Sequence, residues 1–196
     1  MSISPIGFFD SGIGGISVWK EVVKLLPREN TIYLADSKNS PYGLKSISEV
    51  QDISSKNTKW LINRGCKLIV VACNTATTNS INLLRTKFEI PFVGIEPGIK
   101  PAIKESKNGK IGVLATRGTL SSKLFEETSQ SIYGIDTIER HGDGIVEIIE
   151  SGEFENNELE SLLREYLNPM IDYGICLLYT SPSPRDVEES RMPSSA

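Results

Sequence analysis

The segment that most constrains the fold is Leu68–Asn79, in which an apolar run is followed at once by small polar residues. Leu68–Ala72 holds five apolar residues in a row, a pattern typical of a strand buried on both faces of a parallel sheet. Cys73 ends the run, and Asn74 and Thr75 follow with short side chains that suit the start of a helix. Ligands bind at this point in open parallel sheets, which makes Cys73 our candidate for a reactive base or nucleophile.

The expected position of Cys73 at a helix N-terminus also bears on its ionisation. We expect the helix dipole to favour the thiolate of Cys73. A buried and inert cysteine is the alternative, because free cysteines are common in protein cores. The strand-end position and the polar residues that follow favour the reactive interpretation.

Strands and helices alternate along the rest of the chain. Ile6–Phe9 is a short apolar strand, the glycine-rich turn Asp10–Gly15 follows it, and apolar residues then recur at helical spacing up to Pro27. Similar patterns predict strands at 31–35, 91–95, 110–115 and 136–139, and helices at 47–63, 145–152 and 157–171. Such alternation requires crossovers between parallel strands, so we expect three-layer α/β architecture.

A weak internal repeat divides the chain into two parts. Lys110–Gly118 lines up with Pro5–Gly12, since each contains an Ile-Gly strand that ends at a hydroxyl residue before a glycine. Short repeats also arise by chance, but this one suggests two related α/β lobes that face each other across a cleft. We expect a first lobe at residues 1–97, which carries Cys73, and a second at 98–175.

The repeat fails near the C-terminus. Gly174–Tyr179 opens like Gly65–Cys73, but the position that matches Cys73 is Pro182. Eight of the last twenty residues are Ser or Pro, a composition that does not continue a central sheet. We therefore expect residues 176–196 to be a non-native or disordered tail and the second lobe to be truncated. A genuine divergent C-terminus is the alternative.

Composition excludes several classes of protein. The net charge is −4 and there is no basic run, so a nucleic-acid partner is not expected. There is no apolar run of membrane-spanning length and no leader, so we expect no membrane partner and a cytoplasmic location. The three cysteines show no CxxC spacing, and the single histidine, His141, argues against a His-rich metal site.

Five motifs in series resemble the glutamate racemase family, within the aspartate/glutamate racemase superfamily. They are Phe9–Gly15, Pro41–Gly43, Ala72–Thr77, Gly94–Gly98 and Gly112–Thr119. The resemblance implies two pseudo-symmetric three-layer α/β lobes with mostly parallel sheets, the second incomplete here. It also implies cofactor-independent interconversion of L- and D-glutamate, without pyridoxal phosphate or metal. D-Glutamate for peptidoglycan biosynthesis and a homodimer in the full-length protein are further implications.

The chemistry of racemisation suits these residues. A proton leaves Cα on one face and another returns on the opposite face, which needs two bases with the substrate between them. The resemblance assigns Cys73 to one face, Asp10 to exchanging a proton with it or orienting it, and Glu150 to assisting the second base. Positions that match the family's substrate-binding residues are Asp10, Ser11, Tyr42, Gly43, Asn74, Thr75 and Thr119.

These assignments have plainer alternatives. Asp10 and Ser11 taken alone make an ordinary N-cap and turn, and Glu150 fits a solvated helix carboxylate equally well. The family's second motif, Gly-Cys-Thr-His-Tyr, is missing, and Cys176 lies about six residues too early to replace its cysteine. We therefore expect the chain to be impaired as a racemase. The alternatives are a racemase for aspartate or another acidic amino acid, and a non-catalytic ligand-binding remnant.

Overall fold

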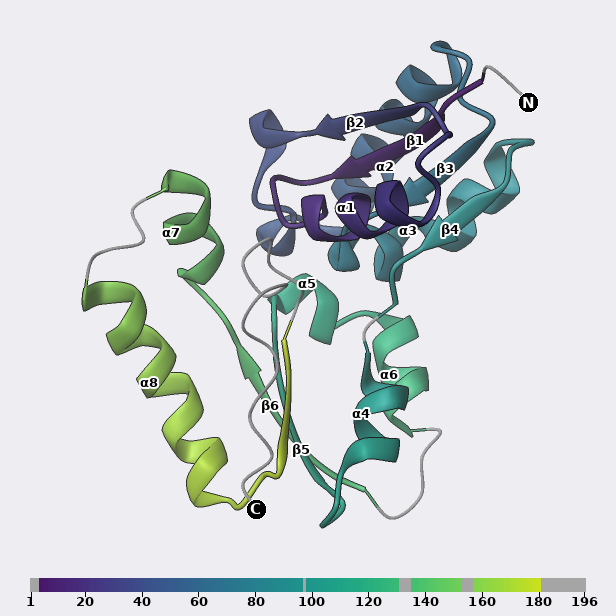
Figure 1. Ribbon diagram of the computed structural model, residues 1–196. Coiled ribbons are helices and arrows are strands. Elements are labelled where there is room, and N and C mark those ends of the chain that lie inside the picture. The colour runs from purple at the N-terminus through teal and green to yellow at the C-terminus, as the bar shows by residue number, and fades with distance from the viewer. Residues whose placement is uncertain (1–3, 97, 131–134, 153–156, 181–196) are drawn as a thin grey trace.

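Two parallel β-sheets form the framework of the protein. The computed structural model describes residues 4–96, 98–130, 135–152 and 157–180 (Figure 1). One sheet has four strands in the order β2-β1-β3-β4, and the other has three in the order β6-β5-β7. Every pair of neighbouring strands in both sheets runs parallel. The expected α/β class with parallel sheets is confirmed.

The first sheet and its helices contain the N-terminal half of the chain. The strands are β1 (Ile6–Asp10), β2 (Thr31–Ala35), β3 (Leu68–Val71) and β4 (Phe92–Gly94). The helices are α1 (Ile16–Leu25), α2 (Ile47–Ile62) and α3 (Asn74–Lys87), with short 3-10 turns η1 (Ser37–Asn39) and η2 (Tyr42–Leu44). The predicted strands and helices of this half are present, with ends shifted by a few residues.

Alternating side chains of β1 divide this half into three layers. Phe8 is fully buried on one face, in a cluster to which Val18 and Trp19 of α1 belong. Phe9 is fully buried on the opposite face, in the cluster that includes Leu61 of α2. Successive residues of a strand point to opposite sides, so two adjacent phenylalanines anchor two helical layers.

The second sheet is built in the same way. Its strands are β5 (Lys110–Ala115), β6 (Asp136–His141) and β7 (Leu177–Thr180). Its helices are α4 (Ile99–Glu105), α5 (Arg117–Leu120), α6 (Lys123–Gln130), α7 (Ile145–Ser151) and α8 (Asn157–Asp172). Helices α4 and α6 cover one face of the sheet, and α7 and α8 lie on the other (Figure 1). Ile111 and Val113 of β5 pack with Ile99 and Phe125 on the first face, and Met170 lies against Gly112 on the second.

Strand register supports the internal repeat. Ile6 at the start of β1 pairs with Thr31 of β2 and Leu68 of β3. Ile111 of β5 pairs with Thr137 of β6 and Leu177 of β7. The Ile-Gly strand is therefore the central member of equivalent three-strand units, with matching partners on both sides.

The strand that the sequence opens after Gly174 extends over four residues of the expected tail. Residues 177–180, which fell within the expected tail, form β7 and pair with β5. The physical reason is that Leu177 and Tyr179 are apolar enough to pack on the core beside β5, whereas the Ser/Pro-rich sequence begins only after them. Residues 181–196, which include Pro182, lie outside the described residues. Within the described ranges, no helix has the length and apolar character needed to cross a membrane.

A matched pair of leucine substitutions tests the first core. Leu61 is fully buried beneath the sheet, whereas Leu25 at the end of α1 is 78% exposed. We expect Leu61→Ala to lower the free energy of unfolding by about 3 kcal/mol or more, because it removes apolar contacts and leaves a cavity. Leu25→Ala should change it by no more than about 0.5 kcal/mol. Urea unfolding followed by circular dichroism measures both, and equal losses would contradict the arrangement of α2.

Candidate active site

Asp10 is fixed at the carboxyl end of β1 by the glycine-rich turn. Its side chain is buried, and its Oδ2 accepts a hydrogen bond of 2.9 Å from the backbone N–H of Gly15. Gly15 has to be glycine for close packing, since an added Cβ would lie 2.7 Å from the Cβ of Ala72. The turn thus brings the start of α1 against the end of β3 and holds the carboxylate between them.

Cys73 occupies the equivalent position at the end of β3. It is the N-cap of α3, is buried, and its Sγ accepts a hydrogen bond of 3.4 Å from the backbone N–H of Ala76. The thiol lies 3.6 Å from the Oγ of Ser11, and that hydroxyl lies 3.5 Å from Oδ1 of Asp10. Cys73, Ser11 and Asp10 therefore form a line of polar groups at the adjacent ends of β3 and β1.

Burial controls the protonation of this line. Burial, together with the negative charge of Asp10, raises the pKa of the Cys73 thiol to about 12, although hydrogen bonds from Ala76 and Ser11 lower it. The amide of Ala76 at the start of α3 lowers the pKa, in the direction that the sequence predicts, but loss of hydration and the charge of Asp10 outweigh it. Cys73 is a neutral thiol at neutral pH.

Asp10 is affected by the same burial. Desolvation raises the pKa of its carboxyl group, while hydrogen bonds from the backbone of Gly15, Ser11 and Gly12 and from the Cys73 thiol lower it. Two anions cannot both be stabilised in so small a buried space. The pair therefore holds one proton, which the Cys73 thiol carries.

Thr75 and Thr119 meet at the contact between the two halves. The Oγ1 atoms of Thr75, Thr116 and Thr119 lie within 2.8–3.1 Å of one another. Next to them, the side-chain amide of Asn79 donates to the backbone carbonyl of Gly118 at 2.8 Å. Thr116 was not among the expected site residues. The sequence contained a signal for it, because Thr116 occupies the position in the second half that is equivalent to Ser11 in the internal repeat.

Asn74 contacts the last described strand. Its Nδ2 donates a hydrogen bond of 3.1 Å to the hydroxyl of Tyr179 in β7. In the free protein this expected substrate-binding group is therefore engaged by a residue that the sequence assigned to the tail.

The Tyr42 side chain does not line an open site. Tyr42 is almost fully buried, and its hydroxyl donates to Oδ2 of Asp36 at 2.6 Å. Its neighbour Gly43 lies at the contact between the halves, where an added Cβ would be 2.6 Å from the Cβ of Thr116. Within the Pro41–Gly43 motif, it is therefore the main chain around Gly43 that remains suited to binding a ligand.

Glu150 reaches across from α7 to the glycine-rich turn. Its Oε1 accepts a hydrogen bond of 3.1 Å from the backbone N–H of Ile13, and its carboxylate lies against Gly12. A freely solvated carboxylate does not describe this position. The hydroxyl of Tyr33 lies in the same region and donates a hydrogen bond of 3.4 Å to the carbonyl of Gly12. Burial raises its pKa, and the nearby carboxylates of Asp10 and Glu150 raise it further. No spacing in the sequence marked Tyr33.

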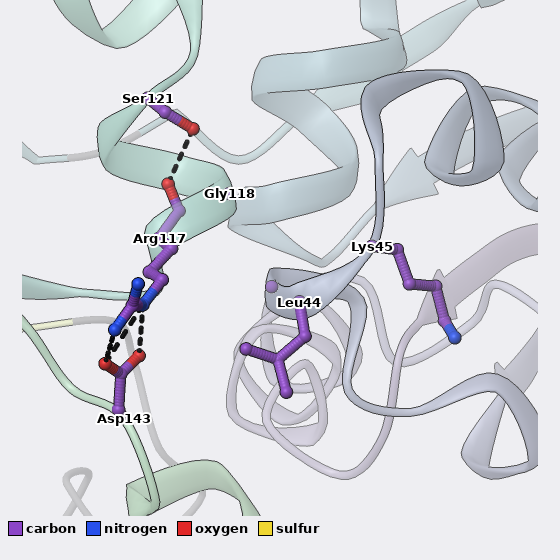
Figure 2. A pocket seen from close by; sticks show the side chains of 7 residues that line it. Leu44, Lys45, Arg117, Gly118, Ser121 and Asp143 are labelled. Atoms are coloured by element: carbon purple, nitrogen blue, oxygen red, sulfur yellow. Dashed lines mark hydrogen bonds and ion pairs between the residues drawn. The ribbon is translucent and has the colours of Figure 1, made fainter.

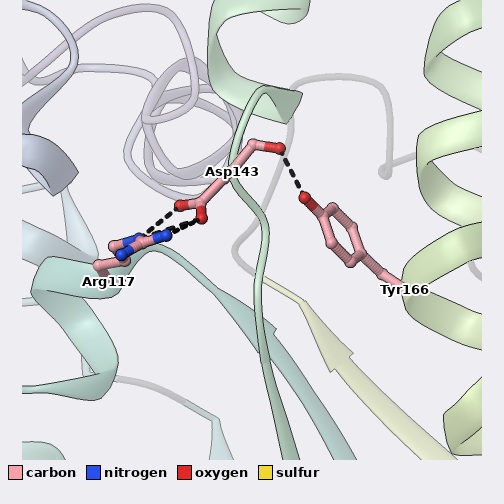
Figure 3. A network of polar contacts seen from close by, with 3 residues as sticks. All are labelled: Arg117, Asp143 and Tyr166. Carbon is pink, nitrogen blue, oxygen red and sulfur yellow. Dashed lines mark hydrogen bonds and ion pairs between the residues drawn. The ribbon is translucent and has the colours of Figure 1, made fainter.

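A surface hollow of about 600 Å³ opens where the two halves meet (Figure 2). It is lined by Gly43, Leu44, Lys45, Arg117, Gly118, Ser121 and Asp143. Arg117 forms an ion pair with Asp143, in which Nε lies 3.0 Å from each carboxylate oxygen and Nη2 lies 2.6 Å from Oδ2. The backbone carbonyl of Asp143 accepts a hydrogen bond from the Tyr166 hydroxyl (Figure 3). Buried Asp10 and Cys73 do not line the hollow. Two of its lining residues pack against site residues, Gly43 against Thr116 and Gly118 against Thr75.

Comparison with known proteins identifies the class of this fold and site. The model of the Asp/Glu/Hydantoin racemase family matches residues 6–177. The chain therefore belongs to this family.

Glutamate racemases are among the curated relatives and solved structures that resemble this chain. The enzyme of Ralstonia pickettii is 43% identical over 170 residues, and that of Roseiflexus sp. is 47% identical over 175. These alignments cover 86% and 88% of this chain but only 60% and 64% of the relatives, so the chain spans less than two thirds of their length. The structure of Escherichia coli glutamate racemase in complex with L-glutamate and the activator UDP-MurNAc-Ala has a TM-score of 0.82 at 32% identity, over 92% of this chain and 70% of that one.

Thiol alkylation tests the electrostatics of the site. Cys176 is exposed, and the Ser106 hydroxyl together with nearby backbone amides lowers its pKa, whereas Cys73 is buried with a pKa of about 12. Only the thiolate reacts, so at pH 8 iodoacetamide should modify Cys176 first and Cys73 only after unfolding in urea. Peptide mass spectrometry against time measures both rates. Modification of Cys73 at the rate of Cys176 in the folded protein would show that the sulfur is ionised and accessible.

Proposed function

We propose that the site binds glutamate and that Cys73 removes the proton from its Cα. The observation that carries the proposal is the line from Cys73 through Ser11 to Asp10, buried at the adjacent carboxyl ends of β3 and β1. Family membership and the glutamate racemase relatives support glutamate as the substrate.

The pKa of Cys73 suggests how binding starts the reaction. The free thiol is neutral, and it has to lose its proton before it can act as a base. The ammonium group of a bound amino acid is a positive charge that lowers the pKa of nearby acids. Bound glutamate therefore favours transfer of the thiol proton towards Asp10 through Ser11. The thiolate left behind is poorly hydrated and correspondingly basic.

The Cα proton is a weak acid, so binding has to stabilise the carbanion-like transition state. The backbone N–H groups at the starts of α1 and α3 favour carboxylates, and the hydroxyls of Thr75 and Thr119 supply further hydrogen bonds. Abstraction forms the S–H bond and breaks the C–H bond, and the electron pair spreads into the substrate carboxylate.

Inversion needs a second proton donor on the opposite face. The family's second cysteine motif has no counterpart in this sequence, where Pro182 stands at the expected position of the cysteine. Glu150, which the resemblance assigns to assisting that second base, accepts a hydrogen bond from the backbone of Ile13. We therefore propose that the chain as given is impaired as a racemase and exchanges the Cα proton from one face only. The full-length parent would act without a cofactor, as a cytoplasmic homodimer that supplies D-glutamate for peptidoglycan.

A non-catalytic glutamate-binding protein is the second candidate. The protonated Cys73 thiol and the hydrogen bond between Asn74 and Tyr179 favour it, because binding alone needs no thiolate. Aspartate or another acidic amino acid remains the alternative substrate, to be tested in the same assay.

Proton exchange in deuterium oxide tests the proposed function. We expect one glutamate enantiomer to gain deuterium at Cα in the presence of the chain, because Cys73 works on a single face, with little or no conversion to the other enantiomer. Proton NMR measures the exchange and chiral chromatography measures inversion, with L- and D-aspartate in parallel. Rapid inversion would refute the impairment. Binding of glutamate without exchange of either enantiomer would favour the second candidate.

A further inference from the structure

Asp36 lies directly beside the proposed site, although no motif singled it out. It follows the last residue of β2, and its backbone N–H donates a hydrogen bond of 2.9 Å to the carbonyl of Asp10. The two aspartates are therefore neighbours on adjacent strand ends. Their side chains have different partners, because the carboxylate of Asp36 faces the η2 segment.

The Asp36 carboxylate gathers three side chains. Its Oδ2 accepts hydrogen bonds from the Tyr42 hydroxyl at 2.6 Å and from the Asn57 amide at 3.1 Å. The Asn39 amide donates to Oδ1 at 2.8 Å and to Oδ2 at 3.0 Å. Asn57 also donates to the Tyr42 hydroxyl at 3.0 Å, which closes a triangle of polar groups. Each of these three side chains presents a donor to the carboxylate oxygens of Asp36.

This cluster holds one side of a tightly confined segment. Tyr42 is 1% exposed, and burial together with the Asp36 hydrogen bond raises the pKa of its hydroxyl, which stays protonated and donating. On the other side, Gly43 packs against Thr116. A Cβ added to Gly43 would lie 2.6 Å from the Cβ of Thr116 and 3.0 Å from its Cγ2 and Oγ1 atoms. The Tyr42–Gly43 main chain is thus fixed between Asp36 in the first half and Thr116 in the second.

We propose that Asp36 is a positioning residue, which acts through the Tyr42 hydroxyl to hold the Gly43 main chain against the glutamate site. The inference deepens the proposed function and rests on it for the identity of the ligand. Asp36 itself does not touch substrate on this account. Its effect is on how well the segment is preorganised for binding, and the proton transfer at Cys73 is left unchanged.

Asp36→Asn tests this with little change in shape. The substituted amide presents N–H groups to donors that previously faced carboxylate oxygen, so the Tyr42 and Asn57 contacts cannot all be kept. Asp52→Asn, at an exposed position of α2, is the matched control. We expect Asp36→Asn to weaken glutamate binding by about tenfold, measured by calorimetry, because hydrogen bonds to a charged group are lost. The rate of Cα deuterium exchange at saturating glutamate should match that of the control.

Two further readouts separate positioning from a general loss of stability. Hydrogen–deuterium exchange of the free protein should show faster amide exchange at residues 42–45 in Asp36→Asn, while the amides of β1 and β3 are unchanged. Tyr42→Phe should weaken binding similarly, and Asp36→Asn should add little in that background, since both act through one contact.

The outcomes distinguish this inference from the proposed function. Unchanged binding and unchanged amide exchange in Asp36→Asn would overturn the positioning role, as would additive effects with Tyr42→Phe. If the unsubstituted chain binds no glutamate, the proposed function fails. In that case the amide exchange at residues 42–45 still decides whether Asp36 holds the segment.

Discussion

The site depends on one constraint, which is that Asp10 and Cys73 cannot both carry a negative charge in the same buried space. Asp10 ends β1 and Cys73 follows β3, the two central strands of one sheet, and Ser11 lies between the two groups. Burial raises the pKa of both, so the free protein keeps its proton on the sulfur. Under the proposed function, the bound substrate promotes deprotonation of Cys73, because its ammonium group stabilises a negative charge on this pair that the protein alone does not stabilise.

Parallel strands make this arrangement possible. The carboxyl ends of β1 and β3 lie side by side, so residues far apart in sequence meet at one edge of the sheet. The second sheet repeats the register of the first and directs Thr116 and Thr119 to the same region, where they meet Thr75. Glu150 adds a separate contact between the halves at Ile13. The site is therefore a product of both halves of the chain.

The sequence predicted the strand ends well because burial sets them. Apolar runs that stop at Asp10 and Cys73 mark the edge of a parallel sheet without any tertiary information, and the Ile-Gly repeat indicated a second sheet of related topology. The sequence did not predict the partners that side chains find in the folded loops. Tyr42 was expected at the substrate, but its hydroxyl bonds to Asp36, a contact that depends on how the loop folds back on β2.

The sequence also did not predict the pKa of Cys73, for a different reason. The helix N-terminus that lowers it is local and visible in the order of residues, whereas the desolvation that raises it comes from packing over the whole site. Thr116 is the intermediate case. The repeat placed it opposite Ser11, but its partnership with Thr75 appears only when the two sheets are brought together.

The central claim is that the sulfur of Cys73 receives the Cα proton of glutamate. Cys73→Ser tests it most directly, because a hydroxyl keeps nearly the same shape but is a far weaker acid and so ionises much less. The account predicts that Cα deuterium exchange in bound glutamate falls by about a thousandfold while the dissociation constant measured by calorimetry changes little. Exchange at the rate of the unsubstituted chain, with glutamate bound equally well, would contradict it.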